Sequence, residues 1–206
     1  MQLLTEQEKS EIIQAIKEAE KQTSCEFVVT EIEQCDDYNS VRFLWGIIFA
    51  IMVALALELI HSGKVLNVLL AETSGFIIGF FVLGRIPILK RLLVHRRKIL
   101  DEVNYRAWAE FYNQGLYKTR EENGILIMLS VFEKMVVIMA DQGVNRQVTP
   151  DYWEVLKNKI IDGIKQKNAG PVIAEVIKST AEELKKHFPV RPDDKNELSD
   201  GVITKN

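Results

Sequence analysis

The sequence has few cysteines, prolines and histidines and no large excess of one charge. Its 206 residues include two cysteines, five prolines and three histidines, and the formal net charge is −3. Two cysteines are too few for the disulfide framework of a small secreted domain. A weakly negative chain lacks the basic footprint of a nucleic-acid-binding protein. The histidines, at positions 61, 95 and 187, do not have the spacing of a zinc site.

Cys25 and Cys35 lie in or next to one predicted strand. Ten residues of extended chain hold their ends roughly 33 Å apart, which is beyond the reach of a disulfide unless the chain bends sharply. We therefore expect two free thiols in a reducing compartment. The first residues are polar and acidic and have no apolar segment of the kind found in a cleavable signal peptide.

Ionisable residues are scarce between Phe43 and Gly84, although the sequence on both sides is densely charged. Two apolar runs, residues 43–60 and 65–84, are joined by a polar turn at 61–64. A helix needs about 20 apolar residues to cross a hydrocarbon layer about 30 Å thick, so we predict a transmembrane hairpin at 42–86. The alternative is a buried helical hairpin in a soluble core. Core helices rarely stay apolar on every face over this length.

Two acidic residues lie inside the predicted hairpin. Glu58 is near the turn, where its carboxylate can reach the membrane interface. Glu72 is about two turns into the second helix, where a charged carboxylate costs a few kcal/mol. A shallow or structural position and a functional role are both open for Glu72. Gly75 and Gly79, with the small Ser74, have the spacing that lets two helices approach closely.

Basic residues predict the orientation of the hairpin. Arg42 precedes the first helix, Lys64 is the only basic residue in the turn, and six basic residues follow the second helix: Arg85, Lys90, Arg91, Arg96, Arg97 and Lys98. By the positive-inside rule both termini are cytoplasmic, and we expect an integral protein of a bacterial inner membrane. Residues 86–94 combine apolar and basic positions and are expected at the bilayer surface.

The sequence outside the hairpin predicts alternating helices and strands. Thr5 and Glu8 form a capping box at the start of the first helix, and residues 26–33 predict a strand with alternating exposure. Further helices are predicted at 97–114, 151–166 and 171–187, with Ile99, Val103, Ala107, Trp108 and Phe111 on one face of the first of these. The apolar runs 124–130 and 135–140 predict central strands covered on both faces.

A lone helix and strand cannot bury a core, so the first two elements need partners from beyond the hairpin. The predicted fold class is α/β: an α/β/α sandwich with a small mixed sheet, interrupted by the two-helix transmembrane hairpin. The domain is expected to comprise residues 1–36 and 95–190. The polar tail, 191–206, is predicted to be disordered.

Several segments of the soluble sequence resemble the TPM domain family, which includes thylakoid-lumen, photosystem-repair and receptor-modulator proteins. These segments are Thr23-Ser24-Cys25-Glu26, Arg106 with Phe111, Lys118-Thr119, residues 122–127, residues 133–143, Trp153 and His187-Phe188-Pro189. The resemblance covers 1–36 and 95–190. Cys25 stands where the family usually has glycine, and the hairpin is internal where members usually have a terminal anchor.

The resemblance implies an α/β/α sandwich and a role in photosystem repair, receptor regulation or association with respiratory complexes. Some members have been assigned acid phosphatase activity or calcium binding. Members are usually extracytoplasmic, whereas the basic residues around this hairpin predict a cytoplasmic domain.

Asp141 directly follows a predicted strand, and strand ends in α/β folds collect ligands. With Glu122, Asn123 and Asp151 it could give oxygen ligands to a divalent cation such as calcium. The alternative is a turn aspartate that bonds its own backbone. No loop has the spacing of a dedicated calcium motif.

Two further residues join the candidate site. Arg106 could bind an anion or pair with Asp141, or form an ion pair that holds its helix to the sheet. Thr119 could contribute to a ligand site or form a loop hydrogen bond.

The sequence contains no convincing catalytic cluster. A cysteine phosphatase holds its thiolate in a glycine-rich, arginine-bearing loop, which neither cysteine has. An aspartyl enzyme needs further acidic residues around a metal, and Asp141 meets only the requirement of following a strand. We therefore expect a membrane-anchored interaction, assembly or regulatory module for a membrane protein complex, in contact with lipid and not with nucleic acid. The alternative is a membrane-tethered phosphatase or metal-dependent hydrolase.

Overall fold

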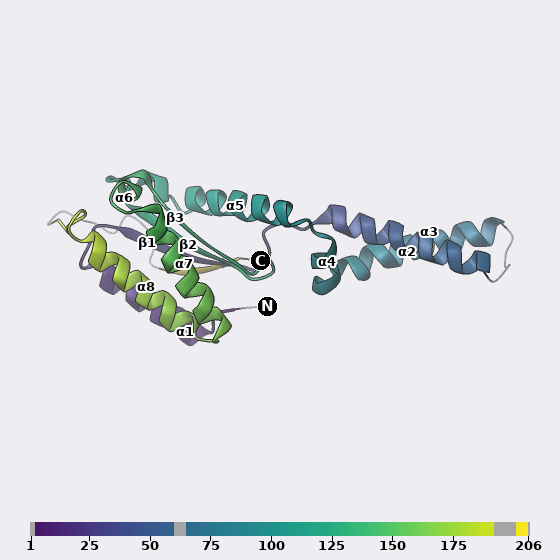
Figure 1. Cartoon of the computed structure of the whole chain (residues 1–206), viewed down its shortest axis with the longest axis horizontal. Coiled ribbons are helices and arrows are strands. Elements are labelled where there is room, and N and C mark those ends of the chain that lie inside the picture. Colours follow the sequence, from purple (N-terminus) through teal and green to yellow (C-terminus); the bar gives the residue numbers. More distant parts are fainter. Residues whose placement is uncertain (1–2, 60–64, 192–200, 206) are drawn as a thin grey trace. The chain divides into compact units, whose positions relative to one another are not determined.

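The computed structural model describes residues 3–59, 65–191 and 201–205. The chain divides into two compact units, one formed by Met1–Cys35 with Asp101–Asn206 and the other by Asp36–Leu100. The first is a mixed α/β unit, and the second contains two long apolar helices (Figure 1). The α/β unit is therefore discontinuous in sequence, in agreement with the predicted fold class. The predicted polar turn at 61–64 lies outside the described residues.

The α/β unit is built on one mixed sheet in the order β3-β2-β1-β4. Its strands are β1 (Glu26–Ile32), β2 (Gly124–Ser130), β3 (Met135–Ala140) and β4 (Val202–Lys205). β1 runs parallel to both β2 and β4, and β2 runs antiparallel to β3. Glu26 lies opposite Gly124 at one end of the sheet, and Ile32 lies opposite Lys205 at the other.

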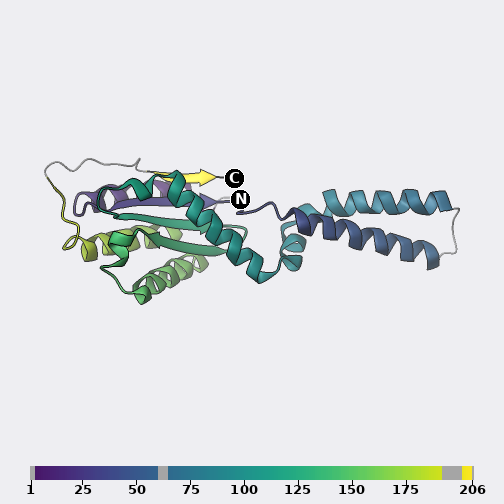
Figure 2. The same cartoon turned by 90° about the horizontal axis from the view of Figure 1, so that it is seen from above.

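Helices cover both faces of the sheet. One face carries α1 (Glu6–Glu20), α7 (Pro150–Lys165) and α8 (Ala169–Leu184), and α5 (Arg96–Asn113) lies on the other (Figures 1 and 2). The three-helix side holds the larger apolar core, which includes Ile12, Ile16, Phe27, Val29, Ile127, Ile160, Ile173 and Ile177. On the opposite side α5 buries Val103, Ala107 and Phe111. The unit is therefore the predicted α/β/α sandwich.

The helix boundaries follow from local chemistry. The backbone N–H of Glu8 donates to Thr5 Oγ1 at 3.2 Å, and the backbone N–H of Thr5 donates to Glu8 Oε2 at 2.8 Å. This is the predicted capping box of α1. Gly115 follows the end of α5 with φ of 79°, a left-handed conformation that glycine adopts without strain. The chain then enters the short 3-10 helix η2 (Leu116–Lys118) and the loop before β2.

Four predictions about these elements are wrong. Every residue of β1 is buried, rather than alternate ones, because β1 has neighbours on both edges and helices on both faces. β3 is an edge strand and not a central one. Trp108 is exposed, because it lies one position beyond the buried Ala107 on α5. The tail contributes β4, because backbone pairing with β1 orders Val202–Lys205.

The second unit begins with a pair of helices packed side by side, α2 (Asn39–Leu59) and α3 (Val65–Phe81) (Figure 2). The helical stretches Asn39–Leu59 and Val65–Arg85 each have 21 residues and are long and apolar enough to cross a membrane. A Cβ atom added to Gly79 would lie 2.8 Å from the Cα atom of Gly46. The two backbones therefore approach closely at Gly79, one of the two glycines that the sequence suggested, where it meets Gly46.

The polar residues of the hairpin are accommodated in different ways. The hydroxyls of Thr73 and Ser74 donate to the carbonyls of Leu69 and Leu70, each at 2.8 Å, so they are satisfied within α3. Glu58 is exposed. Glu72 is half-buried and lies one turn before Gly75, on the side of α3 that faces α2. Glu72 therefore belongs to the helix–helix side of the hairpin.

Candidate functional site

The loop between η2 and β2 carries three of the predicted site residues. The Thr119 hydroxyl donates to the carbonyl of Leu116 at 3.1 Å and accepts from the backbone N–H of Asn123 at 3.1 Å. The Asn123 side-chain amide donates to the carbonyl of Ser24, which ties the start of β2 to the start of β1. Thr119 therefore shapes the loop, and Asn123 joins the two parallel strands where they begin.

The amide oxygen of the Asn123 side chain, unlike its nitrogen, lacks a partner among the described residues. Asn123 Oδ1 is buried and has no hydrogen-bond partner in the described part of the chain. A buried acceptor without a donor costs free energy. It is the only oxygen of the predicted set in this condition within residues 3–59, 65–191 and 201–205.

Asp141 lies beside this loop at the end of β3. Its carboxylate caps the short helix α6 (Gln142–Asn145) by accepting from the backbone N–H of Gln142 at 2.7 Å. The backbone N–H of Asp141 donates to the carbonyl of Gly124 at 2.9 Å. A Cβ atom on Gly143 would lie 2.6 Å from the carbonyl oxygen of Glu122, so only glycine lets α6 sit against the loop. The expected turn role for Asp141 is thus the one observed.

The Glu122 carboxylate forms an ion pair with Arg146. Its Oε2 lies 2.7 Å from a guanidinium nitrogen of Arg146. The backbone of Glu122 has a φ of 54°, which is unusual for residues other than glycine and asparagine. Glu122 and Asp141 therefore occupy the same end of the sheet, as predicted, but each carboxylate already has a partner. Among the described residues, no group of three or more His, Cys, Asp or Glu side chains could hold a metal ion.

Arg106 lies at the opposite end of the sheet. Its Nε is 3.2 Å from Glu110 Oε1 on the same helix, and the geometry is that of an ion pair and not of an aligned hydrogen bond. The second Glu110 oxygen lies 2.6 Å from Nζ of Lys205, which is opposite Ile32 at the end of β1. The Asp141 loop lies at the start of β1, roughly 20 Å away along a seven-residue strand.

Arg106 therefore does not pair with Asp141, and its own ion pair, with Glu110, lies within α5 and does not by itself hold that helix to the sheet. The pair that holds α5 to the sheet is Glu110 with Lys205, a cation that sequence reasoning did not consider. Thr119, Glu122, Asn123 and Asp141 therefore lie at one end of β1 and Arg106 at the other, and Asp151 is exposed in the first turn of α7.

Both thiols are unsuited to nucleophilic chemistry. Cys25 and Cys35 are free, as predicted. Burial raises the pKa of Cys25 to about 12 and that of Cys35 to about 12. Because the thiolate is the nucleophile, a raised pKa keeps both cysteines unreactive near neutral pH.

A feature that sequence reasoning missed is an aromatic stripe, which we define as Tyr105, Trp108, Tyr112 and Tyr117. The first three lie on one face of α5 at helical spacing, with 73%, 64% and 62% of their surface exposed. Tyr117 extends the stripe because its ring stacks on that of Tyr112, with centroids 4.3 Å apart and planes inclined by 3°. The spacing of 105, 108 and 112 was visible in the sequence, but Trp108 was assigned to the buried face.

The fold and the site geometry define a mixed α/β protein that carries an inserted pair of apolar helices. No protein-family model matches the chain, and no curated protein matches it. The chain is similar to the NMR structure of the BA42 protein from the psychrophilic bacterium Bizionia argentinensis, with 23% identity and a TM-score of 0.59. The similarity covers 99% of this chain and 97% of that chain. At this identity it shows a shared fold alone.

Proposed function

We propose that this protein is a membrane-anchored interaction module for a membrane protein complex, possessing a bilayer-spanning hairpin and a cytoplasmic α/β unit. The aromatic stripe is the observation that carries the proposal. Large exposed apolar patches on soluble surfaces mark interaction sites. Tyrosine and tryptophan are enriched in binding hot spots because they bury much area.

The chemistry beside the stripe supports one class of partner. The Lys118 ammonium lies 5.5 Å from the centre of the Tyr117 ring, and both residues are exposed. A basic group next to aromatic rings favours an apolar surface with an acidic rim, because charges at the edge of an interface steer association and select partners. The proposed occupant is such a surface on the cytoplasmic part of another membrane protein.

The membrane part of the proposal rests on the length and composition of α2 and α3 and on the basic residues at one end of the hairpin. In this proposal both termini are cytoplasmic and the membrane is a bacterial inner membrane, and the distribution of basic residues supports that orientation through the positive-inside rule. Cys25 cannot report this orientation because it is fully buried. A cysteine introduced at the exposed Lys17 of α1 is expected to react with an impermeant maleimide only after the membrane is opened. Labelling of intact cells would contradict the orientation.

The partner is best tested by photocrosslinking in the native membrane. A photoreactive amino acid replaces Trp108 in the full chain, and a control carries it at Val155, an exposed apolar residue of α7. We expect a crosslink to a membrane protein from position 108 and none from position 155. The Lys118→Glu substitution should weaken the crosslink. Equal crosslinking from both positions, or no crosslink from 108, would contradict the proposal.

The hydrolase alternative is favoured only by the shared location of Asp141 and Glu122. Their carboxylates are engaged by Gln142 and Arg146, and Arg106 lies at the other end of β1. A phosphate-ester assay on the full chain in detergent separates the two functions. Hydrolysis that is lost in the Asp141→Ala protein would establish the enzyme and overturn the interaction module as the main role.

A further inference from the structure

A short amphipathic helix follows the hairpin. The chain leaves α3 through the 3-10 helix η1 (Leu83–Arg85) and forms α4 (Pro87–Leu93). Ile88 and Leu92 are one turn apart on α4, with 81% and 73% of their surface exposed. Arg91 is also exposed. An exposed apolar pair with adjacent basic groups is the pattern of a helix that lies in the membrane interface.

One hydrogen bond joins α4 to the hairpin, and two cation–π contacts lie at the same end of the hairpin. The indole Nε1 of Trp45 in α2 donates to the carbonyl of Leu89 at 3.0 Å. The Arg42 guanidinium carbon lies 4.6 Å from the centre of the Phe80 ring, and that of Arg85 lies 5.8 Å from the centre of the Phe81 ring. A tryptophan and two arginines on aromatic rings therefore mark this end of the hairpin. Such residues concentrate at the boundary between lipid and water.

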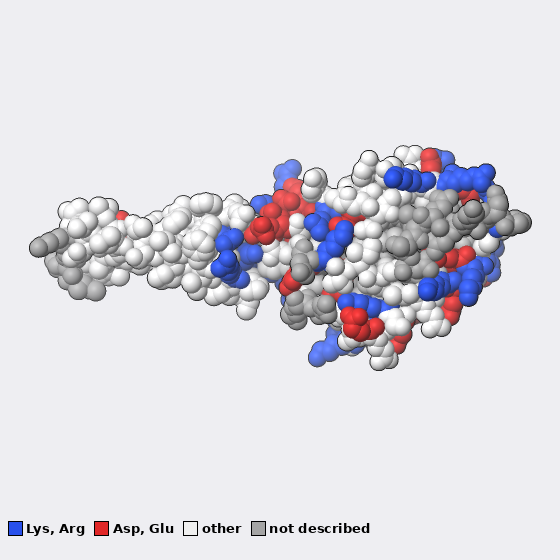
Figure 3. Space-filling view, turned by 180° about the vertical axis from the view of Figure 1, so that it is seen from behind, with Lys and Arg blue, Asp and Glu red and all other residues white. Residues whose placement is uncertain are grey.

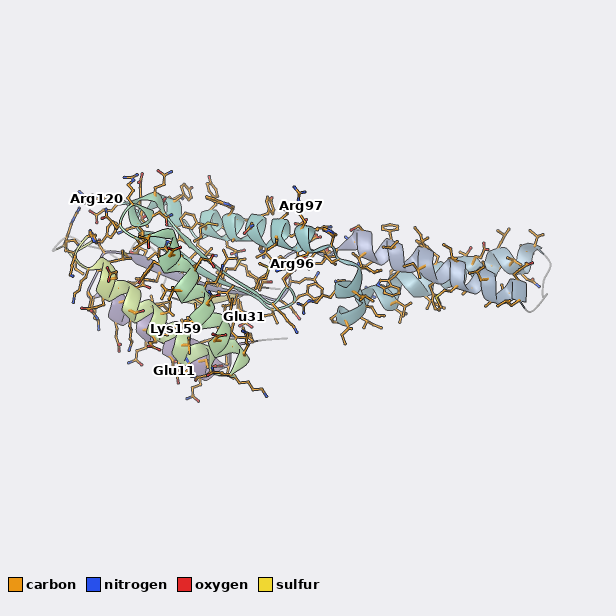
Figure 4. The ribbon with its side chains drawn as sticks, in the orientation of Figure 1. Glu11, Glu31, Arg96, Arg97, Arg120 and Lys159 are labelled. Atoms are coloured by element: carbon orange, nitrogen blue, oxygen red, sulfur yellow. The ribbon has the colours of Figure 1, made fainter. Side chains whose placement is uncertain are left out.

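The same end of the hairpin is strongly basic. Seven cations lie in or next to it: Arg42, Arg85, Lys90, Arg91, Arg96, Arg97 and Lys98. The acidic residues near these cations in the sequence are Asp36, Asp37, Asp101 and Glu102, and Asp36 is paired with Lys98 at 3.2 Å, so cations outnumber carboxylates here by seven to four. Figure 3 shows basic side chains gathered at this end of an otherwise apolar hairpin, and Figure 4 shows Arg96 and Arg97 at the first turn of α5.

We propose that α4 and this basic end form a binding surface for anionic phospholipids. Ile88 and Leu92 insert among the upper acyl chains, and Arg85 and Arg91 bind the headgroup phosphates. Guanidinium groups suit this role because they form paired hydrogen bonds to phosphate oxygens. The proposal rests on the membrane anchoring proposed above and adds a lipid class to it.

The apolar pair distinguishes a lipid from a free anion as the ligand. A soluble phosphate would make no contact with two exposed apolar side chains beside the arginines, whereas the acyl chains of a lipid would bury them. Juxtamembrane basic residues contribute about 1 kcal/mol each toward an anionic surface. The loss of one arginine is therefore expected to weaken the preference for anionic lipid about fivefold.

The fluorescence of Trp45 reports on the lipids around α4, because its indole is hydrogen-bonded to Leu89 of that helix. The full chain, with Trp108→Phe and Trp153→Phe so that Trp45 is the remaining tryptophan, is placed in bilayer nanodiscs of phosphatidylcholine and phosphatidylglycerol in equal parts. In one sample the phosphatidylglycerol carries brominated acyl chains, and in the other the phosphatidylcholine does. We expect stronger quenching of Trp45 by brominated phosphatidylglycerol.

Substitutions then assign the preference to the arginines. The Arg85→Gln/Arg91→Gln protein should lose it. The control, Lys17→Gln/Lys21→Gln, removes the same charge from exposed positions at the end of α1 and should keep it. Equal quenching by both lipids would overturn the lipid site and leave membrane anchoring intact. Absence of quenching by either lipid would show that the hairpin does not insert, which overturns both. A preference abolished by inorganic phosphate, but not by chloride at equal ionic strength, would replace the lipid with a soluble anion.

Discussion

The Nζ atom of Lys205 lies 2.6 Å from Oε2 of Glu110, so the last strand of the sheet is joined to the helix that covers one of its faces. Glu110 is buried, and its second oxygen faces Arg106 at 3.2 Å. A buried carboxylate requires such partners, because an unpaired buried charge is strongly destabilising. The pair therefore anchors β4, which has only four residues.

The first prediction concerns this anchor. Lys205→Met removes one of the two cations that face Glu110 and is expected to destabilise the docking of β4 by about 1–2 kcal/mol, less than for a fully buried pair because Lys205 is partly exposed. Hydrogen exchange of the amides of Val202–Lys205 should become about tenfold faster. Amide exchange measured by mass spectrometry checks this.

The matched control is Lys178→Met, which removes a cation paired with Glu18 at 2.7 Å on the surface of the α1–α8 layer. Exposed pairs contribute little, so exchange of β4 should not change. A Lys205→Met protein whose β4 amides exchange at the rate of the parent would show that backbone pairing with β1 alone holds the strand.

Periodicity and apolar runs predicted the long helices and the first three strands, but not the short helices α4 and α6 or the strand β4. Val202–Lys205 is too short for a pattern, and its partner β1 lies more than a hundred residues earlier in the chain. The run of apolar residues in β3 is typical of a central strand. Whether a strand is central or at the edge depends on which other strands pair with it. No local signal carries that information.

The candidate site was predicted in part. The positions of Glu122, Asn123 and Asp141 at one end of the sheet follow from their places next to β2 and β3. The location of Arg106 does not, because it depends on the direction in which α5 crosses the sheet. The aromatic stripe could have been found from the spacing of Tyr105, Trp108 and Tyr112. Its exposure depends on α5 having a single buried face.

The second prediction concerns the thiols. Burial raises the pKa of Cys25 and of Cys35 from 9.0 to about 12, so maleimide should modify neither at an appreciable rate at pH 8 until the chain unfolds. The raised values also make the thiols stabilising below pH 9, and this contribution is lost as pH rises from about 9 towards 12. Labelling rates with and without denaturant test this. Rapid labelling of the folded chain would contradict the burial of the reacting cysteine.

The third prediction concerns helix packing in the hairpin. Gly79→Ala would place a Cβ atom 2.5 Å from the carbonyl oxygen of Trp45, so α2 and α3 must separate, at a cost of about 1–3 kcal/mol. In Gly75→Ala the nearest atom is Val53 Cγ2 at 3.0 Å, a side-chain atom that can shift. In detergent, the midpoint temperature of thermal unfolding should fall for Gly79→Ala and change little for Gly75→Ala. Equal effects would contradict the close approach at Gly79.

The fourth prediction separates the two faces of α5. Trp108→Ser alters an exposed side chain and should change the free energy of unfolding by no more than about 0.5 kcal/mol. Phe111→Ser empties a buried site and is expected to cost about 3–5 kcal/mol. Chemical denaturation of the two proteins makes the comparison. Strong destabilisation by Trp108→Ser would mean that the stripe is part of the core and not a docking surface.

The fifth prediction concerns Asp141. Because its carboxylate accepts from the backbone N–H of Gln142, Asp141→Ala should destabilise the α/β unit by about 0.5–2 kcal/mol through loss of the helix cap. Asp141→Asn retains an oxygen acceptor and should preserve most of the stability. A cation ligand or a catalytic acid needs its charge, and Asp141→Asn removes that charge as completely as Asp141→Ala does, so in those roles both variants would lose the function.

Denaturation of the three proteins, with and without calcium, therefore distinguishes the roles. Calcium that stabilises the parent but neither variant would establish a cation site at Asp141, and stability that follows the capping order with no response to calcium would establish the cap.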